Sequence, residues 1–241
     1  MRRRLILSVE QNRNKIKGTV VIPVLNEAEQ IVSCIQDTQQ KLGPNWKIVV
    51  VDGGSCDQTM PLLQSQSVTL LSSTKGRALQ MNAAMCVIEG PLVLFLHADT
   101  RLPKETEQEL MRFQSTSALW GRFDVAISPC DWRMRCIAGF MNMRSRMTGI
   151  ATGDQALFLH SSLFRQLQGF AEIALMEDIE FSRRLLSFSR PYCSKRKVMT
   201  SGRKWQQDGV IKTVCLMWAM RLAYFFGVSP ARLNRYYYRT S

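Results

Sequence analysis

Histidine is scarce in this chain of 241 residues, and its cysteines follow no recognisable pattern. The two histidines are His97 and His160, and the seven cysteines are scattered without a C-x-x-C pair. These counts exclude a metal site built from several histidines, and they argue against a zinc finger or a disulfide framework. Cysteine used in this way is typical of a reducing compartment, so we expect a cytoplasmic protein.

Long apolar runs are absent as well. No segment has the ~20 uninterrupted apolar residues that a membrane-spanning helix needs, and Ser8 and Glu10 interrupt the N-terminal apolar stretch too early for a signal-peptide core. The nearest approach is 212–228, where Arg221 is the only interior charge, followed by a tail of arginines and tyrosines. Such a segment is typical of a helix at a membrane–water interface, and equally of one packed on the core or on another subunit.

Positive charge is in excess. Lys and Arg total 32 against 19 acidic residues, which gives a net charge of +13. This excess favours an anionic partner such as nucleotide phosphates, anionic lipid headgroups or nucleic acid, with a basic solvated surface as the simplest alternative. Length and a hydrophobic fraction of 46% are typical of a globular protein with a sizeable core. We expect a basic arm at 1–17, an α/β domain at 18–207, and an apolar helix with a basic aromatic tail at 208–241.

One apolar run is followed directly by polar side chains that can bind a ligand. Leu92–Leu96 shows no polar alternation, which favours a strand buried on both faces, as in a parallel sheet. His97, Asp99 and Thr100 follow it, at the strand end where open α/β sheets bind ligands. A carboxylate held there can bind a divalent metal or a sugar hydroxyl. The alternative is that Asp99 caps the next turn.

Two further apolar runs end in the same manner. Thr19–Leu25 is followed by Asn26-Glu27, and Trp46–Val51 is followed by Asp52-Gly53-Gly54. Glycines let the backbone turn sharply and approach a ligand, although neither G-x-G-x-x-G nor G-K-[ST] occurs. An aspartate at a strand end can accept two hydrogen bonds from a base or a ribose, whereas Asp57 suits an ordinary helix cap. Strands alternating with helices in this way indicate a nucleotide-type α/β fold.

Charged residues at helix starts add two candidate sites. Lys75-Gly76-Arg77 opens a helix over 78–88, where cations oppose the helix dipole unless an anion such as a diphosphate is bound; a solvated pair is the alternative. Glu177-Asp178 opens a helix over 179–186, where acids can simply cap. A partly buried carboxylate there would instead have a raised pKa, which suits a general base. Between them, we expect Trp120–Ile127 to be a strand at a sheet edge.

Taken together and in order, these stretches resemble the inverting glycosyltransferases of family 2, which have the GT-A fold. The resemblance covers about Thr19 to Trp205 and rests on V-I-P-V-L-N-E, V-V-V-D-G-G-S-C-D-Q-T, K-G-R-A-L-Q-M-N, L-F-L-H-A-D-T-R-L-P, G-D-Q and M-E-D-I-E-F-S-R-R-L. The subtype it most resembles is the one associated with arsenosugar biosynthesis, through G-R-x-x-Q-M-N, H-A-D-T, G-D-Q-A and L-M-E-D. It implies a Rossmann-like, mixed and mainly parallel sheet flanked by helices, with a C-terminal apolar helix, in an enzyme that transfers a hexosyl group.

The resemblance also implies roles for particular residues. Asp178, with Glu177 beside it, would be the general base, and Asp99 would coordinate a divalent metal, Mn²⁺ or Mg²⁺, that bridges the donor diphosphate. The donor nucleotide-sugar would contact Pro23, Asn26, Glu27, Asp52, Gly53, Lys75, Arg77, His97 and Asp99. The acceptor and the donor sugar would contact Gly153, Asp154, Gln155, Arg203 and Trp205.

The same resemblance implies the partners. We expect a nucleotide-sugar donor, typically a UDP-sugar, and an acceptor hydroxyl on a small molecule or a lipid. Residues 212–239 would contact a membrane surface if the protein is peripheral on the inner face of the membrane, and nucleic acid is not an expected partner.

One departure from the family pattern concerns the metal. The usual D-x-D is here His97-Ala98-Asp99, so a neutral imidazole replaces one carboxylate and lowers the negative charge of the site by one. Two alternative functions remain: a sugar nucleotidyltransferase, which also uses acidic metal ligands in an α/β site, and a non-catalytic basic protein that binds membrane or nucleic acid.

Overall fold

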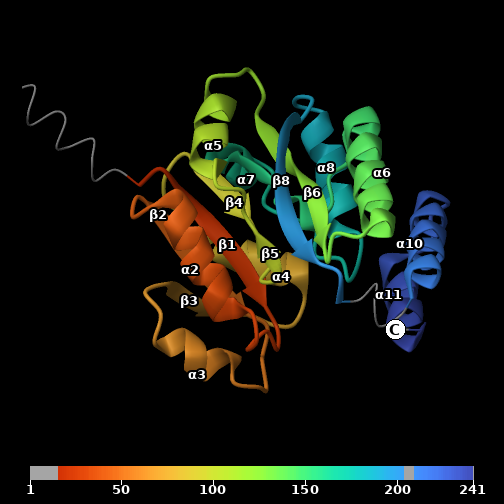
Figure 1. Cartoon of the computed structure of the whole chain (residues 1–241), viewed down its shortest axis with the longest axis horizontal. Helices are drawn as coiled ribbons and strands as arrows, with labels where there is room; N and C mark the ends of the chain where they lie inside the picture. The colour runs from red at the N-terminus through yellow and green to blue at the C-terminus, as the bar shows by residue number, and fades with distance from the viewer. Residues whose placement is uncertain (1–15, 204–208, 241) are drawn as a thin grey trace, which may run out of the picture.

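A computed structural model describes residues 16–203 and 209–240, and in it one eight-stranded sheet is flanked by helices (Figure 1). The strands are β1 (Gly18–Val24), β2 (Trp46–Asp52), β3 (Thr69–Ser72), β4 (Leu92–Phe95), β5 (Thr100–Arg101), β6 (Trp120–Ser128), β7 (Phe158–His160) and β8 (Tyr192–Ser201). The helices are α2 (Ile31–Leu42), α3 (Thr59–Gln64), α4 (Arg77–Ala83), α5 (Thr106–Gln114), α6 (Trp132–Thr148), α7 (Ser161–Gln166), α8 (Glu177–Leu186), α10 (Val210–Phe225) and α11 (Pro230–Thr240), with short 3₁₀ helices η1 (Ala84–Val87) and η2 (Gly153–Gln155).

The central strands are apolar throughout because both of their faces are buried. In β1, Val20 and Ile22 belong to the core on one face of the sheet, and Val21 belongs to the core on the other. In β4, Leu94 and Val93 are divided in the same way. Successive side chains of a strand point to opposite faces of the sheet, and both faces are buried here. Consecutive positions of these strands are therefore apolar, as the unbroken runs of the sequence predict.

The strand order places a binding site at one edge of the sheet. The order is β3-β2-β1-β4-β7-β6-β8-β5; β1 is parallel to both β2 and β4, and β2 is parallel to β3. The chain runs outward from β1 through β2 to β3 and then returns to β4 on the other side of β1. This reversal is a topological switch point, where open α/β sheets bind ligands beyond the carboxyl ends of their strands.

The second half of the sheet is mixed. β7 is antiparallel to β4 and β6, while β6 and β8 are parallel. The prediction of an edge strand over Trp120–Ile127 is wrong: β6 lies between β7 and β8, and Trp120 and Phe123 are fully buried. Polar and apolar residues alternate only weakly along β6 because both faces of this strand are covered. Within the described residues, the short strand β5 pairs with β8 and forms this edge of the sheet.

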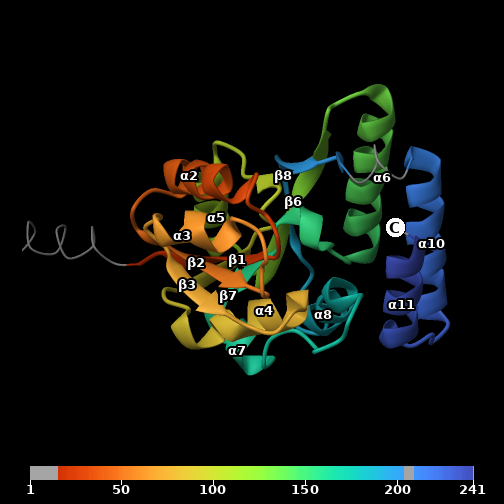
Figure 2. The ribbon, with the colours of Figure 1, turned by 90° about the horizontal axis from the view of Figure 1, so that it is seen from below.

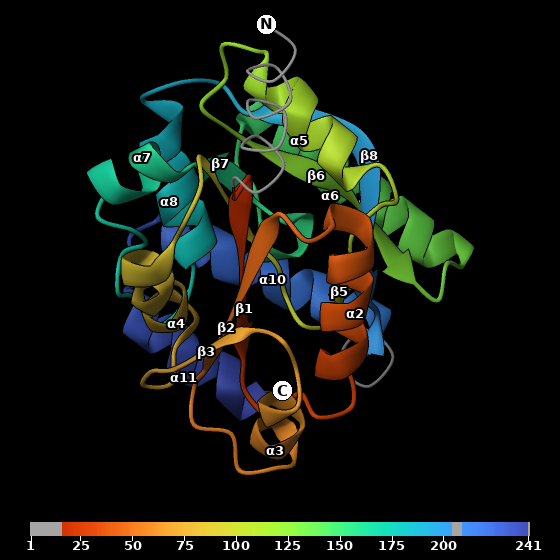
Figure 3. The same cartoon turned by 90° about the vertical axis from the view of Figure 1, so that its left-hand side faces the viewer.

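Helices cover both faces of the sheet. Figure 2 shows α2 and α5 on one face and α4, α7 and α8 on the other, and Figure 3 shows the first three strands between α2 and α4. α6 joins the α2 side through buried Met134, Ala138 and Met141. Polar contacts also fix it to β6, since the Asn142 side chain exchanges hydrogen bonds of 2.9 Å with the backbone N–H and C=O of Val125.

The C-terminal helices α10 and α11 pack beside α6, at the right of Figure 1 and again in Figure 2. α10 covers most of the segment predicted as an apolar helix over 212–228. Among the described residues, no helix combines the length and the apolar character needed to cross a membrane. Apart from its last two residues, the predicted basic arm at 1–17 lies outside the described part of the chain.

Candidate active site

The loops after β1 and β2 hold each other in place. The Asn26 backbone N–H donates to Ser55 Oγ at 2.9 Å, and the Asn26 side chain accepts from the Cys56 N–H at 2.8 Å. Asp57 accepts from the backbone N–H groups of Ala28 and Thr59, and its hydrogen bonds hold the pKa of this exposed carboxyl below its usual value. Asp57 therefore joins the loop after β1 to the start of α3. It is not the N-cap residue of α3, as one alternative from the sequence had it, because that position is Gln58.

Asp52 is buried at the end of β2 and is held by its own loop. Its carboxylate accepts from the N–H groups of Gly54 and Ser55 at 2.9 and 3.1 Å, and from Ser55 Oγ at 2.5 Å. Gly53 lies against the Gln80 side chain, because a Cβ at this position would come within 3.0 Å of the Gln80 amide. The glycine is itself buried and thus serves close packing inside the loop.

Gln80 and Asn82 are structural residues of this site that the sequence analysis did not single out. Gln80 Nε2 donates to the carbonyl oxygens of Val24 at 2.7 Å and Val51 at 2.9 Å, and so ties α4 to the ends of β1 and β2. Asn82 exchanges hydrogen bonds with the backbone of Phe170 at 2.8 and 2.9 Å. Both residues belong to the stretch Q-M-N, but their hydrogen-bond partners are distant in sequence, so the sequence alone did not indicate these contacts.

A cavity of about 220 Å³ lies beyond β1 and β4, on the side of these loops. Its lining includes Pro23, Glu27, Lys75, Arg77, His97 and Asp99. Burial and the neighbouring charge of Asp99 raise the pKa of Glu27, against the lowering effect of Arg203, whose guanidinium lies 3.6 Å from the Glu27 carboxylate. The fold therefore brings predicted residues from three separate segments to one cavity, which we call the donor-side cavity after the role predicted for these residues.

His97 and Gly153 connect this cavity to a second one. A Cβ on Gly153 would approach the His97 ring to 2.5 Å, so any other residue at this position would displace the ring. His97 Nδ1 lies 3.5 Å from an Asp154 carboxylate oxygen. Burial tends to raise the pKa of Asp154, but His97 and Arg77 outweigh it and hold the pKa below its usual value. The imidazole thus lies at the boundary between the two cavities, with Gly153 on the side of the second one.

Asp178 faces the second cavity at the start of α8. Its carboxylate accepts from the Gly153 N–H at 3.1 Å and from the Ile179 N–H at 2.8 Å. Burial first, and the adjacent Glu177 carboxylate second, raise the pKa of Asp178 to about 6. A carboxylate with such a pKa is ionised at neutral pH and still basic enough to accept a proton from a hydroxyl during a reaction.

The second cavity, of about 230 Å³, is called here the acceptor-side cavity. It shares Arg77, His97 and Asp99 with the donor-side cavity and extends to Glu177 and Asp178. Burial tends to lower the pKa of Arg77, but Glu177, Asp154 and Asp178 raise it above its usual value, which keeps the guanidinium charged.

The C-terminal helices close the acceptor-side cavity on one side. Thr213, Met217, Met220 and Arg221 of α10 line it, together with Tyr237 of α11. The sequence analysis did not assign these residues to a site, although a single charge inside an otherwise apolar helix, Arg221, was a signal that one face of this helix has a polar environment.

The remaining predicted residues lie in three different settings. Gln155 is fully buried behind the site, where its side chain accepts from the Thr152 N–H at 3.2 Å and donates to Asn142 at 3.4 Å. Arg203 reaches Glu27 and Glu29 from the end of β8. Trp205 lies outside the described residues.

The side chains around Asp99 fit a metal that is shared with a substrate. Within the described residues, no group of three or more His, Cys, Asp and Glu side chains could hold an ion by itself. Asp99 lines both cavities, and after burial its negative charge is the next cause of the raised pKa of Glu27, so a cation between the two carboxylates would be stabilised. Mg²⁺ commonly takes one or two carboxylates and completes its shell with substrate phosphates and water.

The mixed α/β fold is that of the GT-A glycosyltransferases. The structure resembles S. aureus TarS 1-349 with a TM-score of 0.62 and 19% identity, over 77% of this chain and 60% of that one. It also resembles the mannosyltransferase PcManGT of Pyrobaculum calidifontis, solved with GDP-Man and Mn²⁺, with a TM-score of 0.61 and 20% identity, over 76% of this chain and 56% of that one. At these identities the likeness establishes the fold.

The family model "Glycosyl transferase family 2" matches residues 19–166, and the chain belongs to this family. Among curated proteins, the undecaprenyl-phosphate 4-deoxy-4-formamido-L-arabinose transferase of Salmonella paratyphi B is 32% identical over 100 residues, which cover 37% of this chain and 31% of that protein. The match therefore spans about a third of the length of this relative.

Replacing Gln80 by leucine should destabilise the fold. The substitution removes the donor that two buried carbonyl groups share, and we expect the free energy of unfolding to fall by about 2–4 kcal/mol. Chemical denaturation measures this change. The exposed Gln64→Leu in α3 is the matched control and should change stability by less than about 0.5 kcal/mol. Equal free energies of unfolding for the two variants would contradict the role of Gln80 in tying α4 to β1 and β2.

Asp178→Asn should raise the melting temperature at pH 8. The folded-state pKa of about 6 lies above the usual value of 3.8, so the folded state binds a proton more readily, and wild-type stability declines as pH rises from about 4 through 6. The neutral amide avoids this loss. The difference in melting temperature should therefore be smaller at pH 5 than at pH 8, while exposed Glu172→Gln shows no such trend. A pH-independent difference would be incompatible with the raised pKa.

Proposed function

We propose that this chain is an inverting glycosyltransferase that moves a sugar, expected to be a hexosyl group, from a UDP-sugar to an acceptor hydroxyl. The observation that carries the proposal is the position of Asp178. Its carboxylate faces a cavity that meets the donor-side cavity at Arg77, His97 and Asp99. A base on one side of this junction and a cation-lined cavity on the other suit a single displacement, which inverts the anomeric centre.

The donor would lie across the ends of β1, β2 and β4. The uracil base is assigned to the Asp52-Gly53 loop and the diphosphate to Lys75 and Arg77, whose cationic side chains come from the start of α4. Arg77 remains protonated because acids of the acceptor-side cavity raise its pKa. A fixed positive charge next to a departing diphosphate stabilises the negative charge that develops there.

The reaction would then proceed in one step. The Asp178 carboxylate takes the proton of the acceptor hydroxyl, and the acceptor oxygen forms a bond to the anomeric carbon from the face opposite the diphosphate. The bond between that carbon and the diphosphate oxygen breaks, and UDP leaves with the electron pair. The N–H groups of Gly153 and Ile179 keep the Asp178 carboxylate oriented toward the cavity.

Asp99, with His97 beside it, would hold a divalent metal together with the donor diphosphate. Mn²⁺ or Mg²⁺ bound there supplies Lewis-acid stabilisation of the leaving group. Two solved relatives support the assignment: PcManGT contains Mn²⁺ with GDP-Man, and glucosyl-3-phosphoglycerate synthase of Mycobacterium tuberculosis contains Mn²⁺ with UDP, at a TM-score of 0.56 and 14% identity.

We further propose that the protein works as a peripheral protein at the inner membrane surface. Trp218, Phe225 and Phe226 of the C-terminal region are 53%, 70% and 75% exposed, and Arg232 and Arg235 of α11 are exposed near them. Aromatic and cationic side chains in this combination suit a membrane interface. The subtype associated with arsenosugar biosynthesis stays a prediction from the motifs, and so does the choice between a lipid and a small soluble acceptor.

Asp178→Asn should abolish transfer and leave nucleotide binding intact. We expect UDP release from UDP-glucose or UDP-N-acetylglucosamine to fall by about 10²–10⁴-fold, because the general base is lost. UDP affinity in calorimetry with Mn²⁺ should match wild type. In the wild type, kcat/KM should fall as pH drops below about 6, since Asp178 must be ionised amid Glu177, Asp154, Arg77 and Arg144.

Undiminished turnover by the Asp178→Asn variant would contradict the assignment of Asp178 as the general base. Release of diphosphate from UTP in the presence of a sugar phosphate would instead favour the nucleotidyltransferase alternative.

Asp99→Ala should remove the effect of metal on nucleotide binding. In wild type, we expect Mn²⁺ to strengthen UDP binding by about tenfold or more, equivalent to at least about 1.4 kcal/mol. In the variant, the UDP affinities with and without Mn²⁺ should be equal, as measured by calorimetry, while the exposed Glu172→Ala control behaves as wild type. A variant that keeps the full Mn²⁺ effect would show that Asp99 is not the metal ligand.

A further inference from the structure

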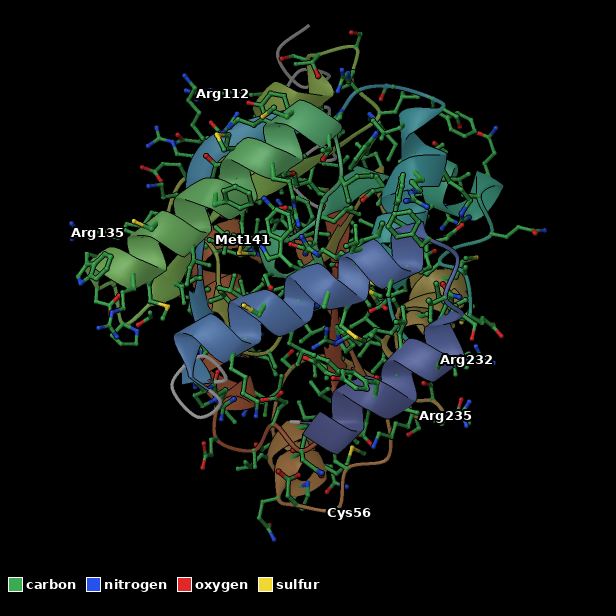
Figure 4. All side chains as sticks on the ribbon, turned by 90° about the vertical axis from the view of Figure 1, so that its right-hand side faces the viewer. Cys56, Arg112, Arg135, Met141, Arg232 and Arg235 are labelled. Atoms are coloured by element: carbon green, nitrogen blue, oxygen red, sulfur yellow. The ribbon has the colours of Figure 1, made fainter. Side chains whose placement is uncertain are left out.

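An apolar groove of about 370 Å³ separates α6 from α10. Its walls are Cys136, Ile137, Phe140, Met141 and Arg144 of α6, and Val214, Met217, Trp218 and Arg221 of α10. Figure 4 shows Met141 on the side of α6 that faces α10, whereas Arg135 points away from it. The volume is within the range of small-molecule sites in proteins.

The groove leads from the surface to the acceptor-side cavity. At its outer end, Phe140 and Trp218 are exposed and their rings lie 5.2 Å apart between centroids, so aromatic side chains form the rim. At its inner end, Met141, Met217 and Arg221 line both the groove and the acceptor-side cavity. A molecule bound in the groove could therefore extend one end to Asp178.

Arg144 gives the groove an anion-binding group. Its Nε and Nη2 atoms are buried and have no hydrogen-bond partner within the described part of the chain. Burial lowers the pKa of Arg144, and nearby Arg122 lowers it further, while Asp178 opposes the shift. A buried guanidinium with unsatisfied N–H groups is costly unless a ligand supplies an acceptor.

The charges of the groove favour a phosphate group. Its described lining contains two arginines, Arg144 and Arg221, and no acidic residue. The planar guanidinium matches the oxygens of a phosphate, and two such groups can bind the two unesterified oxygens of a phosphodiester. The other lining side chains are suited to a hydrocarbon chain, because they offer apolar surface.

We propose that this groove binds the hydrocarbon chain of a phosphate-bearing lipid that is the sugar acceptor. The phosphate, esterified to the hydrocarbon chain on one side and to the head group on the other, lies on Arg144 and Arg221. The chain leaves between Phe140 and Trp218, and the acceptor hydroxyl of the head group faces Asp178. The assignment of the lipid as acceptor rests on the proposed glycosyl transfer, whereas binding in the groove can be tested without it.

The test uses decyl phosphate below its micelle concentration, with calorimetry on the whole protein in the absence of nucleotide. Decyl maltoside supplies a chain without the anion, and inorganic phosphate supplies the anion without a chain. We expect wild type to bind decyl phosphate about tenfold or more tighter than either probe, because the chain and a charge-assisted hydrogen bond act together.

Arg144→Met should weaken decyl phosphate binding by about tenfold and leave decyl maltoside binding unchanged, since a hydrogen bond to a charged group is lost. Its melting temperature should equal or exceed that of wild type, because the variant removes a buried charge with unsatisfied N–H groups. Arg135→Gln, on the same helix but outside the groove, is the matched control and should bind as wild type.

Three results would overturn the proposal: no binding of decyl phosphate, equal binding of decyl maltoside, or an unchanged affinity in Arg144→Met. Binding of UDP with Mn²⁺ is measured on the same samples. Loss of UDP binding in every sample contradicts the proposed glycosyl transfer, while normal UDP binding without decyl phosphate binding contradicts the groove alone.

Discussion

The contact between His97 and Gly153 is the constraint on which the site depends. A Cβ on Gly153 would lie 2.5 Å from the imidazole, so any side chain there would push the ring aside, and glycine lets the end of β4 lie against η2. The Gly153 N–H in turn donates to Asp178 at the start of α8. Segments from the parallel and the mixed halves of the sheet are thus held at fixed distances, and the two cavities meet at a single boundary.

The sequence predicts those parts of the molecule that depend on local pattern. Unbroken apolar runs identify β1, β2 and β4 because both faces of these strands are buried, and the polar residues after each run follow directly. The position of β6 escaped prediction because an interior strand of a mixed sheet can alternate as weakly as an edge strand. Gln80 and the cavity lining from α10 escaped because their roles arise from partners that are distant in sequence.

The site concentrates groups that are unfavourable for folding. Asp178 and Glu27 have raised pKa values because burial and like charges act on their carboxylates, and Arg144 keeps buried N–H groups without partners. Asn26 and Met176, both beside the site, have positive φ angles of 56° and 70°. Strain and unpaired charge of this kind persist where the surrounding structure fixes them and where ligand binding can relieve them.

The division of the cavities between segments bears on how such a protein diverges. The strand ends and the α4 start that form the donor-side cavity lie within residues 19–166, the part that matches the family model. Asp178 and the wall of the acceptor-side cavity from α10 and α11 come from later in the chain. Substitutions in these last helices can therefore change which molecules fit the acceptor-side cavity without changing the lining of the donor-side cavity, so that one scaffold can give rise to proteins that differ in only one of the two cavities.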